Sequence, residues 1–403
     1  MTLPDDTVAT IRTSGTNLSK AKSHNFSVIL EVIRTRGPIS RTVIADITSL
    51  SRQTVQNIVA ELDEAGLIKL SPSEIRGRGH PGMEVTLNPA GALSMGIHVD
   101  RHVLTAVACD LTGAMVWSDT QALAQDTVAA ANHSILEAVK RFRAQMPEIS
   151  ERLLGLCVAA PGPFGSPAPG QKDITSFQEI GEEANVALLV KQTGLPIVLE
   201  NDATAAAVGE WLYGVGKGTS NLAVLHFGMG LGAGFILGGA PYRGRNNNAG
   251  EIGHLVVEAG GRPCFCGNAG CLEQYLSMNS LYRHLDLPPH EQTSIDRIIA
   301  LCNAKDTKML AWLSGASAYL RQAINAIEVM LDPDTIAIGG LAPDALLDQL
   351  IAMATPLLQQ VSPAPPALPR IQRGASGPLT VALGAAAVAI DTHFAPSASR
   401  LVL

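Results

Sequence analysis

The stretch HLVVEAGGRPCFCGNAGCLE, from His254 to Glu273, is the most informative part of this chain. It holds three of the six cysteines, Cys264, Cys266 and Cys271, with His254 ten residues before the first of them. Three thiolates and one imidazole complete a tetrahedral zinc shell with no position left for water, which is the composition of a structural site. Ordinary buried cysteines in a Gly-rich loop are the alternative, but clustered cysteines in a reduced protein more often bind metal. We therefore predict one structural Zn²⁺ per chain, bound by these four residues.

The composition is that of a globular protein with a large core. The chain has 403 residues, 46% of them hydrophobic and 16% charged, and this length predicts two or three domains. The longest apolar stretch, residues 379–390, is too short to span a bilayer. The N-terminus lacks the basic start and apolar core of a secretory signal. Cys109, Cys157 and Cys302 lie in apolar surroundings, as reduced thiols do, so we expect a cytoplasmic protein.

Positive charge is concentrated near the N-terminus. Residues 12–58 carry seven basic and two acidic side chains, a net charge of +5, whereas the whole chain has a net charge of −7. A basic segment on an acidic body is typical of a nucleic-acid-binding arm. A solvated helix face would carry the same charge. The pattern of apolar residues therefore has to distinguish a nucleic-acid-binding segment from such a face.

That pattern predicts three helices. Apolar residues recur at helical spacing over residues 26–33, and Gly37-Pro38 ends this helix. Ser40 and Ser51 are placed to cap two further helices, and the last ends at Ala65-Gly66. This is the layout of a helix-turn-helix. The third helix is expected to expose four side chains whose types can form bidentate contacts with base edges in a major groove: Arg52, Gln53, Gln56 and Asn57.

Two short strand patterns follow, at residues 67–70 and 83–87, and predict a hairpin, or wing. Its tip, EIRGRGHPG, offers Arg76 and Arg78 to a phosphate track or a narrow minor groove. A small helical bundle that binds another protein is the alternative, but layout, charge and exposed side chains together favour DNA. Residues 25–90 are therefore predicted to form a winged helix-turn-helix domain, preceded by an arm at residues 1–24.

The pattern changes to α/β from Leu93 onward. Two strands joined to a third by a turn are expected between residues 94 and 122, followed by an amphipathic helix at 126–145. A later strand in PIVLEN runs directly into an Ala-rich helix, and NLAVLHFGMGLGAGFIL predicts two strands around a glycine turn. DTIAIGGLAP and PLTVALGAAAVAI both predict a strand, a Gly-rich turn and a helix. The two halves share an outline, because each opens with consecutive strands joined by tight turns.

Four motifs link this body to a known family: ENDATAAAVGE, GMGLGAG, NAGEIGH and CxCGxxGCxE. In this order and spacing they make residues 93–390 resemble the ROK family, whose name covers repressors, uncharacterised reading frames and sugar kinases. The winged helix in front matches the repressor branch. The resemblance implies a two-lobed, actin-like and ribonuclease-H-like fold with a sugar cleft between the lobes. The first lobe is then expected at residues 91–200, with 375–390 packing back on it, the second with the zinc site at 201–374, and a tail at 391–403.

The family's sugar-contacting positions carry over one at a time. Carboxylates, an amide and an imidazole can accept and donate hydrogen bonds to the ring of hydroxyls that a sugar presents. His254 would then use one ring nitrogen for zinc and the other for a hydroxyl, and zinc would hold its neighbours in register. A helix N-cap is a further role for the Asn-Asp pair, and Pro161-Gly162 is expected to shape the opposite cleft wall. The five expected sugar contacts are Asn201, Asp202, Glu251, His254 and Glu273.

The chain departs from the family at the phosphate loop. ROK kinases open their body with Asp-x-Gly-Gly-Thr-Lys, and the aligned stretch here is HVDRHV, residues 98–103. His98 replaces the aspartate and Asp100-Arg101 the glycine pair, while Met229 replaces the usual threonine of the later glycine loop. A backbone without those glycines neither turns as tightly nor lets N–H groups approach phosphates. Asp100 could substitute for the missing aspartate, but with the glycines also absent we expect no kinase activity.

The resemblance implies a sugar-responsive transcriptional regulator of carbohydrate metabolism, a repressor rather than an enzyme. Its expected partners are double-stranded operator DNA, a sugar or phosphosugar effector, and further copies of the chain in a homodimer or a dimer of dimers, with no membrane partner. Two alternatives stay open. One is an active ATP-dependent sugar kinase with an appended DNA-binding domain, and the other is a scaffold regulated by protein partners.

Overall fold

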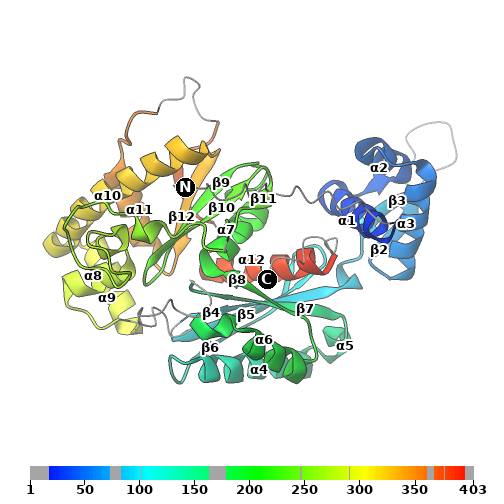
Figure 1. Ribbon diagram of the computed structural model, residues 1–403, viewed down its shortest axis with the longest axis horizontal. Coiled ribbons are helices and arrows are strands. Elements are labelled where there is room, and N and C mark those ends of the chain that lie inside the picture. The colour runs from blue at the N-terminus through cyan, green and yellow to red at the C-terminus, as the bar shows by residue number, and fades with distance from the viewer. Residues whose placement is uncertain are drawn as a thin grey trace, which may run out of the picture. The chain divides into compact units, whose positions relative to one another are not determined.

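The computed structural model describes residues 18–72, 83–100, 102–162, 178–245, 247–289, 291–360, 367–375 and 377–394 (Figure 1). The chain divides into two compact units. The first comprises the residues up to Asn88 together with those from Asp391 onward, and the second comprises Pro89–Ile390. None of the helices in the described ranges is long and apolar enough to cross a membrane.

The first unit is a winged helix-turn-helix, as predicted. Its elements are α1 (Leu18–Arg36), β1 (Ile39–Ser40), α2 (Arg41–Thr48), α3 (Arg52–Glu64), β2 (Ile68–Pro72) and β3 (Met83–Leu87). Ser40 accepts a hydrogen bond from the Val43 amide and Ser51 from the Thr54 amide, so both predicted N-caps are formed. The strands make an antiparallel sheet in the order β1-β3-β2. The predicted wing residues Arg76 and Arg78 lie outside the described residues.

The first sheet of the second unit has the order β6-β5-β4-β7-β8. Strands β4 (Leu93–Val99), β5 (Val103–Asp110) and β6 (Met115–Ala122) form an antiparallel meander, and β7 (Leu153–Ala160) and β8 (Ile197–Asn201) run parallel to β4. One face is covered by α4 (Val128–Gln145), α5 (Pro147–Ser150) and α6 (Glu183–Thr193) (Figure 1). Short 3₁₀ turns stand at Pro89–Gly91 and Gln178–Gly181.

The second sheet repeats this plan in the order β11-β10-β9-β12-β13. Strands β9 (Leu222–Phe227), β10 (Leu231–Leu237) and β11 (Ala240–Pro241) form the meander, and β12 (Thr335–Gly340) and β13 (Ile371–Arg373) run parallel to β9. Its helices are α8 (Met278–Leu285), α9 (Gln292–Asn303), α10 (Thr307–Leu331) and α11 (Asp344–Ala354). Further 3₁₀ turns are η3 (Ile252–His254), η4 (Leu272–Gln274) and η5 (Gly377–Leu379). The repeated outline predicted from the sequence is therefore present, and the two sheets form the two lobes.

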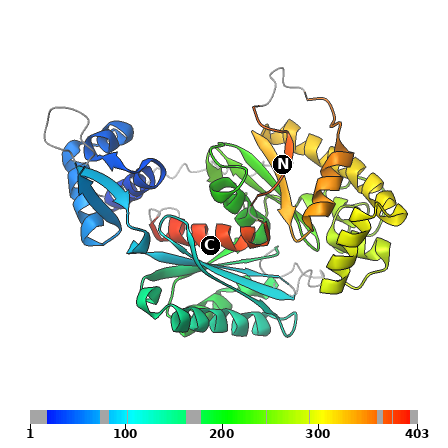
Figure 2. The same cartoon turned by 180° about the vertical axis from the view of Figure 1, so that it is seen from behind.

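Helices α7 (Asp202–Tyr213) and α12 (Thr380–Phe394) pack between the two sheets, as both ribbon views show (Figures 1 and 2). Small residues make this possible. A Cβ placed on Gly384 of α12 would lie 1.8 Å from the backbone oxygen of Ala205 in α7, and one placed on Gly96 of β4 would lie 1.9 Å from that of Ala382. The helices and the sheet thus approach at distances that larger side chains forbid.

The strand expected in PLTVALGAAAVAI is wrong, because the segment is helical from Thr380 to Phe394. A continuous run of buried apolar residues has no period that separates a buried strand from a buried helix. Gly384 suggested a turn, but here it allows two helices to touch.

Candidate functional site

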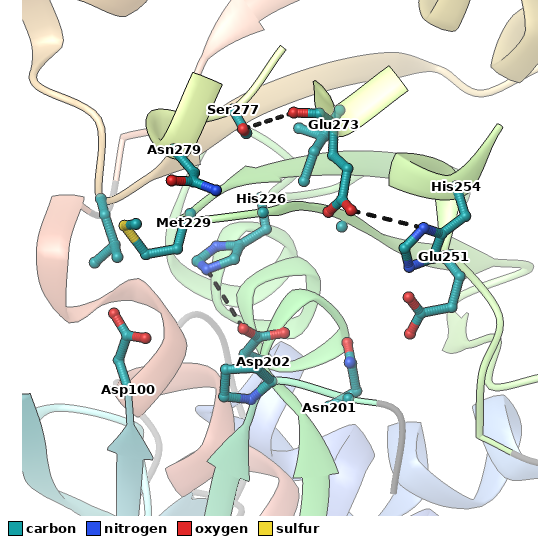
Figure 3. Close-up of a pocket in the computed structure, with 18 of the residues that line it drawn as sticks. Asp100, Asn201, Asp202, His226, Met229, Glu251, His254, Glu273, Ser277 and Asn279 are labelled. Carbon is teal, nitrogen blue, oxygen red and sulfur yellow. Dashed lines mark hydrogen bonds and ion pairs between the residues drawn. The ribbon is translucent and has the colours of Figure 1, made fainter. Parts of the chain in front are cut away.

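A cavity of about 390 Å³ opens in the second unit, lined by residues from both sheets and from the loops that follow their strands (Figure 3). It lies at the carboxyl ends of β4, β8 and β9, the edge at which ligands bind in many α/β folds. All five expected sugar contacts line this cavity: Asn201, Asp202, Glu251, His254 and Glu273. The structure thus brings together residues that lie up to 72 positions apart in the sequence.

Asn201 and Asp202 stand where β8 passes into α7. The Asn201 side chain accepts a hydrogen bond from the Thr204 amide at 3.1 Å, so its expected role as helix N-cap is present. Asp202 Oδ1 accepts from the Ala203 amide at 2.7 Å. Below them Glu200 accepts from the Asn201 amide and pairs with Arg243 at 2.6 Å, which fixes the end of the strand. Pro161 and Gly162 line the cavity as expected.

The carboxyl group of Glu251 is a weaker acid than an ordinary glutamate. Its pKa is raised to about 7, chiefly by burial, and the nearby carboxylates of Asp202 and Glu273 contribute in the same direction. Near neutrality Glu251 can therefore either donate or accept a hydrogen bond. Among the described residues that line the cavity there is neither a lysine nor an arginine to offset the carboxylates.

The cysteine loop meets the geometric requirements of a zinc site. One ligand atom from each of His254, Cys264, Cys266 and Cys271 lies within 4.8 Å of all the others. The Sγ atoms of Cys266 and Cys271 are 3.6 Å apart, and Cys264 Sγ is 3.6 Å from His254 Nδ1. Tetrahedral zinc with bonds of about 2.3 Å to sulfur and about 2.0 Å to nitrogen separates such atoms by about 3.5–3.8 Å. This cluster can hold a metal ion.

Backbone geometry closes this loop. Gly270 has φ 84° and Gly267 φ 96°, and a Cβ on Gly270 would lie 1.6 Å from the carbonyl oxygen of Glu258. Only glycine fits there, as expected for the turn that returns Cys271 to the other cysteines. Few regular elements surround the loop: it is framed by two isolated β-bridges and by the turns η3 and η4.

The cysteine cluster and the cavity share two residues. His254 lines the cavity and directs Nδ1 toward the cysteines, with Glu273 Oε1 3.7 Å from the same nitrogen. Glu273 also accepts from Cys264 Sγ at 3.2 Å, and Ser277 donates to its backbone oxygen at 2.7 Å. A metal ion in the cluster would therefore fix the positions of His254 and Glu273 at the cavity wall.

Two histidines in the cavity were not expected as site residues. His98 entered the sequence argument only as a lost phosphate-loop aspartate, and His226 on β9 was not singled out. In the structure His226 Nε2 is 3.8 Å from Asp202 Oδ2, a contact marked by a dashed line in Figure 3. The ring centroids of His98 and His226 are 6.2 Å apart. Burial lowers the pKa of His98 to about 4, with a partly opposing effect of Asp202. The sequence did contain a signal for His226, because this histidine interrupts an otherwise apolar strand directly before a glycine loop.

The side chains predicted to read DNA lie together on α3. Arg52, Gln53, Gln56 and Asn57 are exposed, whereas the opposite face of the helix is buried. Gln53 Nε2 donates to Asn57 Oδ1 at 2.9 Å, which pre-orders these two amides. The exposed face therefore carries donors and acceptors suited to base edges.

Comparison with known proteins agrees with this architecture. Residues 94–392 match the ROK family and residues 25–79 the MarR family. The xylose repressor of Bacillus subtilis is 28% identical over 78% of this chain and 81% of its own length. A crystal structure of a ROK family transcriptional regulator, a homologue of the E. coli Mlc protein, superposes with a TM-score of 0.73 at 23% identity, covering 93% of this chain and 97% of its own. A ROK hexokinase from Thermus thermophilus covers 73% of this chain and 96% of its own, with a TM-score of 0.56 at 24% identity. The ROK match spans most of the chain, and the protein belongs to the ROK family.

Proposed function

We propose that this protein is a sugar-responsive transcriptional regulator, a repressor whose affinity for operator DNA changes when a sugar or phosphosugar binds in the cavity. One observation carries the proposal: a winged helix-turn-helix with an exposed row of Arg, Gln and Asn side chains stands in one chain with a sugar-kinase-like body. The xylose repressor is similar to this chain along most of its own length, and its name combines a sugar with repression.

In this proposal α3 reads bases with Arg52, Gln53, Gln56 and Asn57, while Arg76 and Arg78 hold the wing to the backbone or the minor groove. The protein binds as a homodimer, or a dimer of dimers, to a site with two-fold symmetry, because paired half-sites mirror a paired protein.

The sugar is held by Asn201, Asp202, Glu251, His254 and Glu273, with one structural Zn²⁺ in the cysteine cluster keeping the last two in place. This is supported by the cavity they share, by the raised pKa of Glu251 and by the contacts between Glu273 and the cluster. When bound, zinc supplies structural cross-linking of the loop, and the chain's own side chains supply the hydrogen bonds to the sugar.

A screen of monosaccharides, amino sugars and their phosphates by thermal denaturation tests the sugar site. An effector at a hundred times its dissociation constant adds about 2.7 kcal/mol to the free energy of unfolding. The same compound is expected to change operator affinity, and Asp202→Ala is expected to abolish both effects while basal DNA binding persists. If none of these sugars stabilises the protein while operator binding is intact, the result favours the alternative function, a scaffold regulated by protein partners.

A sugar kinase is the second candidate, favoured by Asp202 in the cavity and by the shared fold of the hexokinase. We propose instead that the protein does not phosphorylate its ligand. HVDRHV lacks the paired glycines that let backbone N–H groups cradle phosphates, and His98 is a poor ligand for magnesium. Incubation with ATP, magnesium and the best-binding sugar is expected to yield no ADP. Turnover that disappears in Asp202→Ala would establish a kinase.

A further inference from the structure

We propose that the cavity contains a metal site separate from the cysteine cluster, in which His98, Asp202 and His226 bind one divalent transition-metal ion. The three residues come from three elements: His98 from β4, Asp202 from the start of α7 and His226 from β9. Figure 3 shows Asp202 and His226 directed toward one another in the cavity. The fold brings them together from distant parts of the chain.

The spacing of the ligand atoms fits such a site. One atom from each residue lies within 4.8 Å of the other two, and the Nε2 of His226 is 3.8 Å from Oδ2 of Asp202. A tetrahedral ion with bonds of about 2.0–2.1 Å separates its ligand atoms by about 3.3 Å. Small side-chain rotations therefore suffice to close the shell around an ion.

Both imidazoles are buried. His98 is 4% exposed and His226 5% exposed. Desolvation lowers the pKa of His98 to about 4, so at neutral pH its ring is uncharged and keeps a nitrogen lone pair. In His226, Nδ1 is buried without a hydrogen-bond partner among the described residues. A buried polar ring normally has its nitrogens satisfied, so protein hydrogen bonds do not account for where this ring is held.

The charge of the cavity favours a cation. Asp202, Glu251 and Glu273 line it, and their mutual repulsion contributes to the raised pKa of Glu251. The described lining residues include no lysine or arginine. A divalent ion beside Asp202 would offset this uncompensated negative charge more directly than any side chain present.

The ligand set selects the kind of metal. Two imidazoles and one carboxylate suit Zn²⁺, Mn²⁺, Fe²⁺, Co²⁺ or Ni²⁺, whereas Mg²⁺ and Ca²⁺ prefer shells of oxygen. Three protein ligands leave at least one coordination position open. That position faces the cavity, where a hydroxyl of the bound sugar can occupy it. This last step rests on the proposed function, but metal binding itself does not.

Metal titration of the full chain, without sugar or DNA, tests the site. Protein with its cysteine cluster loaded with zinc is titrated calorimetrically with Zn²⁺ and then freed of unbound metal for elemental analysis. We expect two ions per chain at saturation. His98→Gln and His226→Gln should each weaken the second ion at least about tenfold while retaining the first. His133→Gln, a change at an exposed position of α4, serves as the matched control and should bind both.

A melting temperature close to that of the wild type, both with zinc in the cysteine cluster, shows that a histidine variant is folded. Saturation at one ion per chain overturns the proposal, and so does a second ion that binds both variants as tightly as the wild type. Co²⁺ gives an independent readout that needs no variant. The second Co²⁺ ion to bind should not add thiolate charge-transfer absorption, because that absorption belongs to the cysteine cluster. If both ions add it, the second ion is also bound by cysteine, which contradicts the proposal.

Discussion

Glu251 is the cavity residue whose protonation changes near neutral pH. A carboxyl whose pKa rises from 4.5 to about 7 on folding binds its proton more tightly in the folded state than in the unfolded state. Stability therefore falls as pH rises from about 4.5 to about 7, and the loss is complete above that range. The cost is the burial of a charge beside Asp202 and Glu273, which a hydrogen-bonding ligand would partly compensate.

Glu251→Gln should remove this pH dependence, because the amide stays neutral. We expect the difference in unfolding free energy between variant and wild type to grow in favour of the variant from pH 5 to pH 8, by up to about 3 kcal/mol. Urea denaturation at several pH values, without added metal or sugar, measures it. Glu151→Gln, at an exposed position just before β7 in the other lobe, should follow the wild type. A difference that stays constant with pH would assign Glu251 an ordinary pKa.

Motifs singled out the five residues that the cavity brings together, because each stands in a short recognisable pattern. They did not predict the meeting of His98 with His226. Those two residues lie in strands of different sheets, and no local spacing links them. Their proximity depends on how the two lobes pack around α7, which is a property of the tertiary structure alone.

At the scale of elements, α3 is the part of the first unit expected to decide sequence specificity. Arg52 is its first residue, directly after the Ser51 cap, and its side chain is exposed. Arg52→Ala should cost roughly 1–3 kcal/mol of operator binding and relax the preference at one base pair. Binding assays at one salt concentration, on the operator and on single-base variants, measure both effects. Arg36→Ala, which removes an exposed charge from α1, should weaken all sequences alike. The same uniform loss in Arg52→Ala would mean that Arg52 contacts phosphate only.

The cysteine loop is the element whose stability we expect to depend on the proposed metal. It contains two isolated bridges and two 3₁₀ turns rather than a hydrogen-bonded sheet or helix, so little else holds it. Cys271→Ser should lose the zinc, lower thermal stability and weaken the sugar response, while operator binding without sugar persists. Elemental analysis and melting curves measure this, and Cys302→Ala, a buried cysteine outside the cluster, should keep its zinc. Wild-type protein prepared without chelators and found free of zinc would refute the assignment.

Periodic and capped elements could be predicted, whereas buried ones without a period could not. α4 and the helices of the first unit alternate buried and exposed faces, and their expected positions agree with the structure. α12 has apolar residues on all sides, so its pattern is equally that of a buried strand. In the structure it is a helix that packs closely on α7 and β4 at Gly384 and Gly96, and these contacts cannot be read from the local sequence.

At the scale of the whole molecule, α12 is an element that contributes to both units. Its first eleven residues belong to the second unit, and from Asp391 the chain belongs to the first, where Phe394 stacks on Phe26 of α1 at 6.3 Å. Ser27 also donates a hydrogen bond to the backbone oxygen of Phe394. In the second unit the same helix packs against α7, whose first residue is Asp202 of the cavity. If ligand binding in the cavity alters operator binding, we expect α12 to be the element that couples the two.

Thermodynamics makes any such coupling reciprocal. If sugar changes operator affinity by some factor, operator DNA must change sugar affinity by the same factor, and factors of about 5–150 are usual. We expect Phe394→Ala to reduce the effect of sugar on operator affinity, and the effect of operator on sugar affinity, toward a factor of one. The affinity for each ligand measured without the other should stay near that of the wild type. Removing the ring deletes the stacking on Phe26 but touches neither the cavity nor the exposed face of α3. Met330→Ala, an exposed apolar change on α10, controls for truncation alone and should keep the coupling. If Phe394→Ala retains the full factor in both directions, the signal does not pass through the end of α12, and the segment joining β3 to β4 becomes the element to test.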